Sequence, residues 1–583
     1  MTNGTVLEKD WIFQDIDEKN IQSLSFLTEL DYIFCKILNC KKITSENIQD
    51  YLFPKIKKML PNPYIFKDMN RGIENIYKHI EKKNKICIYG DYDVDGASST
   101  AILSKYLKSL NIKHEIYIPD RIKDGYGPNK KIFEKLIKND NKLIITLDCG
   151  TLAFDSILFA KTNKIDTIII DHHKSIEILP DANAVINPNR FDESGKYNYL
   201  CAAGLVFIFL VALNKFLREK KYFYTNKTIE PNLLKYLDLV MLGTVCDVVP
   251  LIDLNRAFVK QGLKVFSERE NLGLKTLSDI SEIDHKFTSK DIAFVIGPKI
   301  NAAGRIGDSS LAANLLLSDD PEYTYSVAKK LHDLNLKRKK IEKIILEGAI
   351  FEAEKQKNDN VLVLSNKEWH EGVTGIIASR IKDLYDKPTV VISINGDLAK
   401  GSARSINGFD MGIAIIKMQQ KKIIVKGGGH SMAGGFSLKT ENIIIFKDEI
   451  NNIYQKKNKH LKKNKLIVDF PISLDALDEK FIDYLNNLEP FGSGNREPVI
   501  LINNTQIAKP IVIKEKHIKF FFKHNNKHIE AISFNCAGKP LGEYLLKKRQ
   551  ERFDAVCKLS INYWNNRQFL QLILLDLKVM KDS

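Results

Sequence analysis

Short runs of apolar, β-branched residues alternate with amphipathic stretches between residues 85 and 190. The runs predict five strands, at Lys85–Tyr89, Ile116–Pro119, Leu143–Asp148, Thr167–Asp171 and Ala184–Asn187. Strands that are apolar on both faces and alternate with helices form parallel sheets covered by those helices. This region is therefore expected to be a parallel α/β domain.

Longer helical stretches follow, at residues 202–217, 231–245 and 321–357. The last is long and heavily charged, as a helix that connects two lobes would be. A second α/β pattern then runs from Val361 to about Tyr454, with strands expected at Val361–Leu364 and Pro388–Ile394.

The last part of the chain reads as β structure. A basic stretch at residues 456–465 is expected to be a solvated linker. Beyond about residue 498, short strands with turn signals predict a small barrel of the OB type. Its aromatic residues lie among cations, which suits stacking on single-stranded bases, but the same aromatics could form the barrel core. These residues are Phe520–Phe522, Tyr563, Trp564 and Phe569.

A chain of 583 residues is too long for one core. We expect a mostly helical N-terminal extension (1–80), the parallel α/β domain (81–255), a helical region that ends in the connecting helix (256–357), the second α/β lobe (358–460) and the OB-like β-barrel (465–583).

The composition, with 44% hydrophobic and 27% charged residues, is that of a globular protein. We find no uncharged apolar run long enough for a bilayer, and MTNGTVLEKDWIF lacks the regions of a secretory signal, so the cytoplasm is the expected location. The eight cysteines are scattered without a CxxC pair, which indicates reduced thiols and no zinc or disulfide framework.

The formal charge of +16 favours an anionic partner such as nucleic acid. Richness in Lys, Ile and Asn, as low-GC coding produces, offers a second explanation of that charge. Arginine is scarce, so each one is informative, because its flat guanidinium binds phosphate in a bidentate way.

Acidic and histidine residues follow several of the predicted strands. The sequence GDYDVDG places Asp91, Asp93 and Asp95 after the first strand, and Asp148 ends the third. The fourth strand ends in Asp171, His172 and His173, and Asp247 follows a helix. Ligands of open α/β sheets bind at the carboxyl ends of the strands, so these side chains are expected to converge there.

Clustered carboxylates repel one another unless a cation neutralises them. Several Asp with one or two His suit Mn²⁺ or Mg²⁺, and a carboxylate shared by two ions would build a two-metal hydrolytic site. The alternative is that each Asp is a helix cap or a turn residue. The coincidence of three such strand ends favours the metal site.

With these motifs the chain resembles the DHH phosphoesterase superfamily, and within it the RecJ single-strand DNA exonucleases. DYDVDG (91–96), LDCG (147–150), DHH (171–173) and GTVCDVVPL (243–251) are similar to the phosphoesterase motifs, in order. PKINAAGRIGD (298–308), GSARS (401–405) and GGGHSMAGGF (427–436) resemble RecJ and DHH-associated segments. The first α/β lobe would then be the phosphoesterase domain and the second the DHH-associated domain.

The resemblance implies two ions, Mn²⁺ or Mg²⁺. Asp93 and Asp148 would hold one of them, and the other would be held by Asp95, Asp148, His172 and Asp247. Asp91 would support the ions, Asp171 would orient the neighbouring histidine, and His173 would contact the scissile phosphate.

Scarce arginines fall within the same motifs. We interpret Arg121, Ser402 and Arg404 as candidates for binding the 5′-terminal phosphate, and Arg305 for a phosphate near the metals. His430 is a further candidate for phosphate contact, with a turn cap as the alternative. For each arginine the alternative is a surface ion pair worth ~0–1 kcal/mol.

The implied activity is 5′-to-3′ hydrolysis of single-stranded DNA to nucleoside 5′-monophosphates, in recombination and repair. The family further suggests a monomer, with a RecQ-type helicase and a single-strand-binding protein as partners. Two rivals remain: a pyrophosphatase or small-nucleotide phosphodiesterase, and a degenerate DNA-binding scaffold. The Asp in the first motif and the third basic domain argue against the former, and the complete ligand set against the latter.

Overall fold

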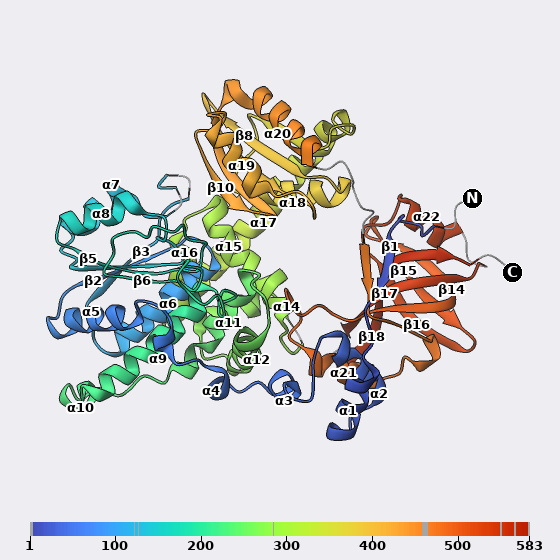
Figure 1. The fold of residues 1–583 in the computed structure, drawn as a ribbon, viewed down its shortest axis with the longest axis horizontal. Helices are drawn as coiled ribbons and strands as arrows, with labels where there is room; N and C mark the ends of the chain where they lie inside the picture. Colours follow the sequence, from blue (N-terminus) through green and yellow to red (C-terminus); the bar gives the residue numbers. More distant parts are fainter. Residues whose placement is uncertain are drawn as a thin grey trace. The chain divides into compact units, whose positions relative to one another are not determined.

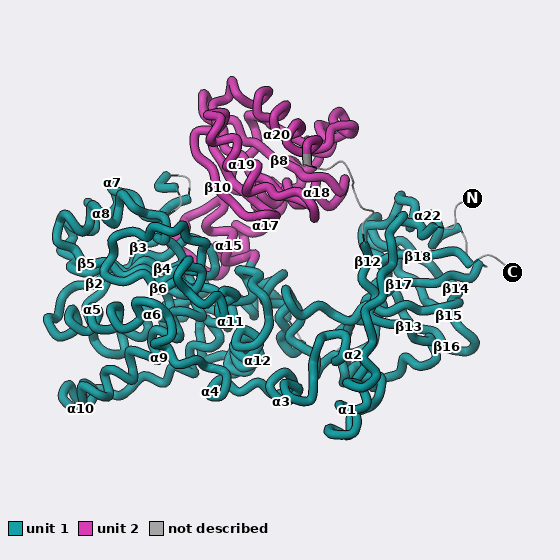
Figure 2. Tube along the Cα trace, viewed as in Figure 1, with its two compact units in different colours: residues 1–297, 313–325, 463–583 teal, residues 298–312, 326–462 magenta. Residues whose placement is uncertain are grey.

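The computed structural model describes residues 4–121, 123–125, 127–283, 285–457, 465–547, 551–564 and 567–580. The chain forms two compact units (Figure 2). The first unit comprises residues 1–297, 313–325 and 463–583, and the second comprises residues 298–312 and 326–462. Among the described residues, no helix combines the length and apolar character needed to cross a bilayer.

A five-stranded sheet in the first unit confirms the predicted parallel α/β domain (Figure 1). Its strands are all parallel and lie in the order β3 (His114–Tyr117), β2 (Ile86–Gly90), β4 (Leu143–Leu147), β5 (Asp166–Ile170) and β6 (Ala184–Ile186). The strand β3 begins two residues before the predicted Ile116, because His114 pairs with Ile86 of β2.

Helices cover both faces of this sheet. Alternate strand residues such as Tyr89 and Ile144 pack with α7 (Lys130–Lys138) and α8 (Phe154–Thr162) on one face. The other face is covered by α5 (Met69–Glu81), α6 (Val94–Ser109) and α9 (Ala202–Glu219). β2 and β4 are buried along their whole length, as an apolar strand between two helical layers must be.

Helices make up the next part of the chain. They are α10 (Tyr222–Thr225), α11 (Leu237–Cys246), α12 (Asp253–Glu268), α13 (Leu272–Ile280), α14 (Ser289–Asp291), α15 (Gly297–Ile306), α16 (Ser310–Leu317) and α17 (Pro321–Lys355). A π-helical turn, Ile292–Ile296, links α14 to α15. The predicted long helix is α17, which begins with a proline in its first turn and spans 35 residues.

The C-terminal strands form a closed barrel. They are β13 (Phe470–Ile472), β14 (Val499–Ile513), β15 (His517–His524), β16 (Lys527–Ser533), β17 (Phe553–Trp564) and β18 (Arg567–Val579). Because β14 pairs with both β15 and β17, the sheet closes on itself and leaves no free edge between them. The expected OB-type barrel is therefore confirmed.

The N-terminal helices share the barrel's core. Buried residues of α1 (Glu18–Thr28) and α2 (Tyr32–Cys40) form one cluster with α21 (Lys480–Leu488) and the barrel strands. β1 (Asp10–Phe13) pairs in parallel with β12 (Lys465–Val468). The two ends of the sequence thus belong to one folding unit, and β1 is a strand that the sequence did not predict.

The second unit is an α/β lobe with a mixed sheet in the order β10 (Lys426–His430), β11 (Ala433–Lys439), β9 (Leu398–Arg404), β8 (Thr389–Asn395) and β7 (Leu362–Asn366). Its helices include α18 (Thr374–Tyr385), α19 (Met411–Gln420) and α20 (Ile443–Lys457). Of the basic stretch expected as a linker, residues 458–464 lie outside the described residues.

Candidate metal centre and phosphate contacts

The carboxyl ends of three adjacent strands carry the acidic and histidine residues. β2 leads to Asp91, Asp93 and Asp95, whereas Asp148 directly follows β4. The DHH triplet at residues 171–173 follows β5. Since β2, β4 and β5 are neighbours, their ends meet at one edge of the sheet, as the sequence predicted. Asp247 joins them from the C-terminus of α11.

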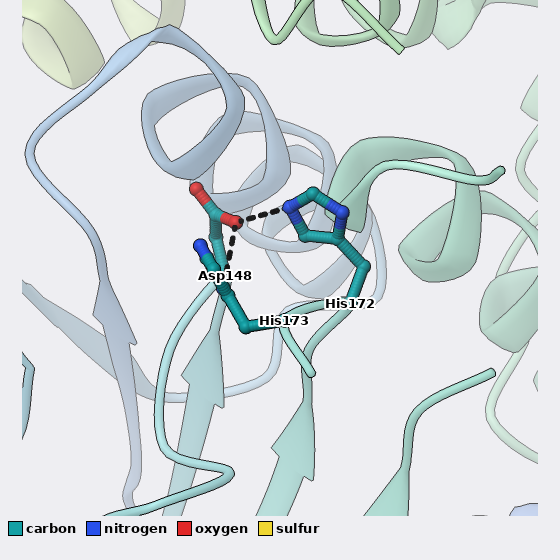
Figure 3. Close-up of side chains that lie close together, drawn as sticks. All are labelled: Asp148, His172 and His173. Atoms are coloured by element: carbon teal, nitrogen blue, oxygen red, sulfur yellow. Dashed lines mark ion pairs between the residues drawn. The ribbon is translucent and has the colours of Figure 1, made fainter. Parts of the chain in front are cut away.

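His172 lies at the centre of this group, which we call the acidic cluster. Its Nε2 atom is 3.2 Å from Asp148 Oδ1, 3.5 Å from Asp247 Oδ2 and 3.9 Å from Asp95 Oδ2. Figure 3 marks ion pairs from the Asp148 carboxylate to both histidines, and His173 Nδ1 lies 3.9 Å from Asp148 Oδ1. The structure therefore brings together every sequence-predicted metal ligand.

Two separate sets of three ligands can be drawn from the acidic cluster, each with ligand atoms within 4.8 Å of one another. They are Asp91, Asp93 and Asp148, and Asp95, His172 and Asp247. A third set, Asp148, His172 and His173, shares one residue with each of them. Carboxylate oxygens with an imidazole nitrogen are suitable ligands for Mn²⁺ or Mg²⁺.

Burial makes this arrangement unfavourable without a cation. Together with the neighbouring carboxylates, it raises the pKa of Asp91, Asp148 and Asp247 well above the usual aspartate range. Burial lowers the pKa of His172. Three buried atoms, Asp91 Oδ1, Asp148 Oδ1 and His172 Nε2, have no hydrogen-bond partner among the described residues. Atoms of this kind are what a metal ion would satisfy, so the residues present fit a metal centre.

Backbone groups fix the acidic side chains. Asp93 caps α6, because its Oδ1 atom accepts hydrogen bonds from the Asp95 and Gly96 amides. Both carboxylate oxygens of Asp95 accept backbone N–H groups at the start of α9, at 2.7 and 3.0 Å. A Cβ at Gly243 would lie 2.5 Å from Asp95 Oδ1, so glycine is required there.

His173 and Asp171 form a second, tight pair, with Nδ1 2.7 Å from Oδ1. Although burial opposes it, this hydrogen bond raises the pKa of His173 to about 9. The same bond holds the pKa of Asp171 well below its usual range, against the effect of burial. The pair therefore places an imidazolium, oriented by a carboxylate, at the edge of the acidic cluster.

Arg121 lies close enough to the acidic cluster that its charge lowers the pKa of Asp91, against the larger effect of burial. Its guanidinium lies over the ring of Tyr92, 5.3 Å from the centroid. Tyr92 was missed by the sequence reasoning. Its position between Asp91 and Asp93 could have singled out Tyr92 in the sequence. Its contact with Arg121 could not have been predicted, because it depends on the conformation of the loop that carries Arg121.

The other phosphate candidates lie in the second unit. Ser402 and Arg404 are two residues apart on β9, so both point to the same face of the strand. Ser402 Oγ is 3.0 Å from Thr374 Oγ1, and a Cβ on Gly375 would lie 3.2 Å from an Arg404 nitrogen. The first turn of α18 thus packs against this pair, which adds backbone N–H groups suited to an anion.

His430 and Arg305 are placed differently. His430 is exposed on β10 and pairs with Ala433, which also pairs with Arg404 on the other side of β11. Arg305 donates a hydrogen bond of 3.3 Å to the carbonyl of Gly372. Within the second unit, the structure brings His430, but not Arg305, onto the sheet that carries Ser402.

The aromatic residues of the barrel differ in burial. Phe520 and Phe522 are fully buried and pack in the core, whereas Phe569 is half-exposed at 47%. Tyr563 stacks on His285 at 4.7 Å. The side chain of Trp564 lies outside the described residues. Phe569 has the exposure that base stacking needs.

Comparison with known proteins supports the assignment of the three domains. Residues 85–244 match a family model described as the DHH family N-terminal domain, residues 358–456 match the DHHA1 domain, and residues 468–576 match the RecJ OB domain. The single-stranded-DNA-specific exonuclease RecJ of Bacillus subtilis is 31% identical, over 98% of this chain and 71% of that relative. The enzyme of the same name from Escherichia coli is 31% identical, over 89% and 91%.

Solved structures are similar over two thirds or more of the chain. RecJ of Thermus thermophilus in complex with Mn²⁺ has a TM-score of 0.81 and 24% identity, covering 98% of this chain and 80% of that chain, which shows the shared fold. A structure described as exonuclease RecJ bound to manganese is 28% identical, with a TM-score of 0.58, and covers 68% of this chain and 96% of that chain.

Proposed function

Because the chain belongs to the RecJ family of single-stranded-DNA-specific exonucleases, we propose that it releases nucleoside 5′-monophosphates from the 5′ end of single-stranded DNA. Membership of the family supports nuclease activity on single strands. The observation that carries the proposal is the acidic cluster, in which buried carboxylates and His172 converge at the strand ends. The same cluster argues against a DNA-binding scaffold without catalytic activity.

Two divalent ions, Mn²⁺ or Mg²⁺, are the proposed cofactors. The two ligand sets of the acidic cluster support this number, with Asp148 Oδ1 close to His172 of the other set. The relative described as bound to manganese supports the choice of metal. When bound, the ions would activate a water molecule and stabilise negative charge on the scissile phosphate.

His173 is the proposed contact to the scissile phosphate. Its raised pKa, to about 9, keeps the imidazole protonated at neutral pH, so it can donate a charged hydrogen bond to a phosphoryl oxygen. Asp171 fixes the ring by holding Nδ1. Asp91, a buried member of the cluster, would support the ions rather than reach the substrate.

Recognition of the 5′ end is assigned to Ser402 and Arg404, with Arg121 as a further contact to the terminal phosphate. Arg404 supplies bidentate donors, and Ser402 lies beside the first turn of α18. Arg305 and His430 are proposed to contact other phosphates of the strand. The half-exposed Phe569 would stack on a base bound to the barrel.

The proposed setting is DNA recombination and repair in the cytoplasm. There the chain would act as a monomer with a RecQ-type helicase, which supplies single strands, and a single-strand-binding protein.

Release of mononucleotides from uniformly labelled single-stranded DNA, with and without Mn²⁺, tests the proposal. The wild type should release them only with metal, and Arg404→Lys should weaken the preference for a 5′-phosphorylated strand while leaving the metal requirement intact. Rapid hydrolysis of pyrophosphate with no release from DNA would instead favour the small-substrate phosphoesterases.

A further inference from the structure

A cavity of about 430 Å³ lies within the first unit, and none of its lining residues belongs to the acidic cluster. The end of α2 and the loop after it, the start of α12, and the loop at residues 494–496 form its walls. Four cationic side chains line it, Lys41, Lys42, Arg256 and Arg496. The carboxylates are those of Asp253 and Asp469, so positive charge is in excess.

Most of that positive charge has no ion-pair partner. Arg496 is paired with Asp469, at 2.5 and 3.0 Å. Lys41 Nζ donates instead to neutral oxygens, Asn495 Oδ1 at 2.8 Å and the Arg496 carbonyl at 2.6 Å. Within the described ranges, no carboxylate lies within 4.0 Å of the charged groups of Lys41, Lys42 or Arg256. Burial lowers the pKa of Lys41 to about 8, with Arg496 and Arg256 acting in the same direction and the charge of Asp469 opposing it.

The floor of the cavity is rigid. Arg256 is 1% exposed, its guanidinium lies 3.9 Å from the Tyr51 ring centroid, and it donates to the carbonyls of Tyr51 and Leu488. Asn495 donates to the carbonyls of Leu488 and Pro490. Groups that are already fixed lose little entropy when a ligand binds, so this is a preorganised positive site.

The start of α12 adds to the same potential. This helix of 16 residues begins at Asp253, and its N-cap residue Ile252 makes no side-chain capping bond, although the Leu254 amide forms a hydrogen bond with the Tyr199 side chain. Its first amide groups therefore carry the positive end of the helix dipole toward the cavity wall. The exposed Asp253 lies beside them but makes no ion pair with the cations among the described residues.

We propose that this cavity binds the phosphate group of a nucleotide, with Lys41 and Lys42 as the contacting cations. A phosphate dianion matches the excess charge, and the volume leaves room for a nucleoside. Two sources share this chemistry, a free mononucleotide and a phosphate within a strand.

Isothermal titration calorimetry on the full chain in EDTA tests the site without turnover. The probes are dAMP, inorganic phosphate and a short single-stranded oligonucleotide. Lys42→Glu and Lys41→Gln should each weaken binding at least about tenfold. The control Lys57→Glu should bind the probes as the wild type does, because Lys57 is exposed on α4 (Ile56–Met59) and does not line the cavity. If dAMP binds more tightly than phosphate, the cavity is a mononucleotide site. If only the oligonucleotide binds, and the lysine variants weaken that binding, the cavity is a site for a phosphate within a strand.

Binding that is equal in the wild type and in Lys42→Glu would overturn the proposal, as would the absence of binding at millimolar probe. Lys42 is exposed, so its replacement keeps the test valid even if Lys41→Gln fails to fold. A further control, Arg404→Ala, should leave cavity binding intact. If Arg404→Ala loses all phosphate binding, the cavity binds no phosphate and the proposal is wrong. The exonuclease proposal stands or falls separately, because no metal is present in this measurement.

Discussion

Asp148 combines three unusual properties at a single residue. It is 1% exposed, its backbone has a φ of 61°, and its carboxylate faces both His172 and His173 (Figure 3). A non-glycine residue in the left-handed region is strained by about 1–3 kcal/mol, and such strain persists where the surrounding structure holds it. Here the Asp148 amide donates to the Ile170 carbonyl of β5, which fixes that backbone.

Asp148→Asn should lower the rate of mononucleotide release by about a thousandfold or more. It removes the charge of a carboxylate that belongs to one ligand set and lies 3.2 Å from His172 of the other, and a loss of several kcal/mol in transition-state stabilisation has this magnitude. Calorimetry with Mn²⁺ should show fewer bound ions. The matched control is Asp155→Asn, an exposed aspartate on α8 of the same domain, which should keep full activity. A variant at Asp148 with near-normal turnover would contradict the assignment.

Tyr92 is expected to position Arg121. Tyr92→Leu removes a cation–π contact worth roughly 0.5–1 kcal/mol, so the ratio of kcat/KM for 5′-phosphorylated over 5′-hydroxyl strands should fall about two- to fivefold. Tyr92→Phe retains the ring and should retain the ratio. An equal loss on both substrates would show that Tyr92 acts on the fold and not through Arg121.

At this scale the sequence predicted which acidic and histidine side chains converge, but it missed contacts such as those of Tyr92 and Thr374. Asp91, Asp148 and His172 could be found because each follows an apolar strand, and strand ends of a parallel sheet must meet. The contact of Thr374 with Ser402 depends on how α18 packs against β9, which no local pattern encodes.

At the level of secondary structure, side chains of α5 form hydrogen bonds with one residue of β5. Asp166 accepts hydrogen bonds from Asn75, Lys78 and His79, at 2.8 to 2.9 Å. These bonds, against the opposing effect of burial, lower the pKa of Asp166 to about 2. The pairing thus stabilises the folded state while the carboxylate is ionised.

Asp166→Asn should therefore reduce the free energy of unfolding by about 1–2 kcal/mol at pH 7, because solvent screens this partly exposed group. Because folding lowers the pKa of Asp166, its ionised carboxylate stabilises the folded state fully above the unfolded pKa of 3.8. This stabilisation is lost as the pH falls through the folded pKa of about 2. The difference between wild type and variant in urea unfolding should start to narrow below about pH 4 and be roughly halved near pH 3. A difference that does not change with pH would mean that packing, and not charge, explains the loss.

The sequence predicted the strands of the parallel sheet, α9 and α17 well, since their apolar runs are long and regular. In the second lobe it predicted β7 and β8 but not the Gly-rich strands β9, β10 and β11. It could not predict the pairing of β1 with β12, because the partners lie more than 450 residues apart and each strand has four residues. It left the roles of Phe520 and Phe522 open, since alternation tells which residues share a face but not which face is inside.

For the molecule as a whole, the N-terminal helices depend on the barrel. Phe34 and Leu38 of α2 are almost fully buried in a cluster with Phe481 and the barrel strands. Each such side chain contributes about 1.5–3 kcal/mol when buried. The first 52 residues are therefore expected to lack a core of their own.

Truncation tests this dependence. A chain that ends at Lys457 keeps α1 and α2 but exposes their apolar faces, so it should aggregate in light scattering coupled to size exclusion. A chain of residues 54–457 lacks both the helices and the barrel and should remain more monodisperse. Equal behaviour of the two would show that the helices fold without the barrel.

The most direct test of the central claim compares two single-stranded DNAs, one with a free 5′ end and one blocked there, in the presence of Mn²⁺. The account predicts mononucleotide release from the free-ended strand alone, and its loss in Asp148→Ala. Equal release from the blocked strand would contradict the assigned polarity, and unchanged activity in Asp148→Ala would contradict the assigned site.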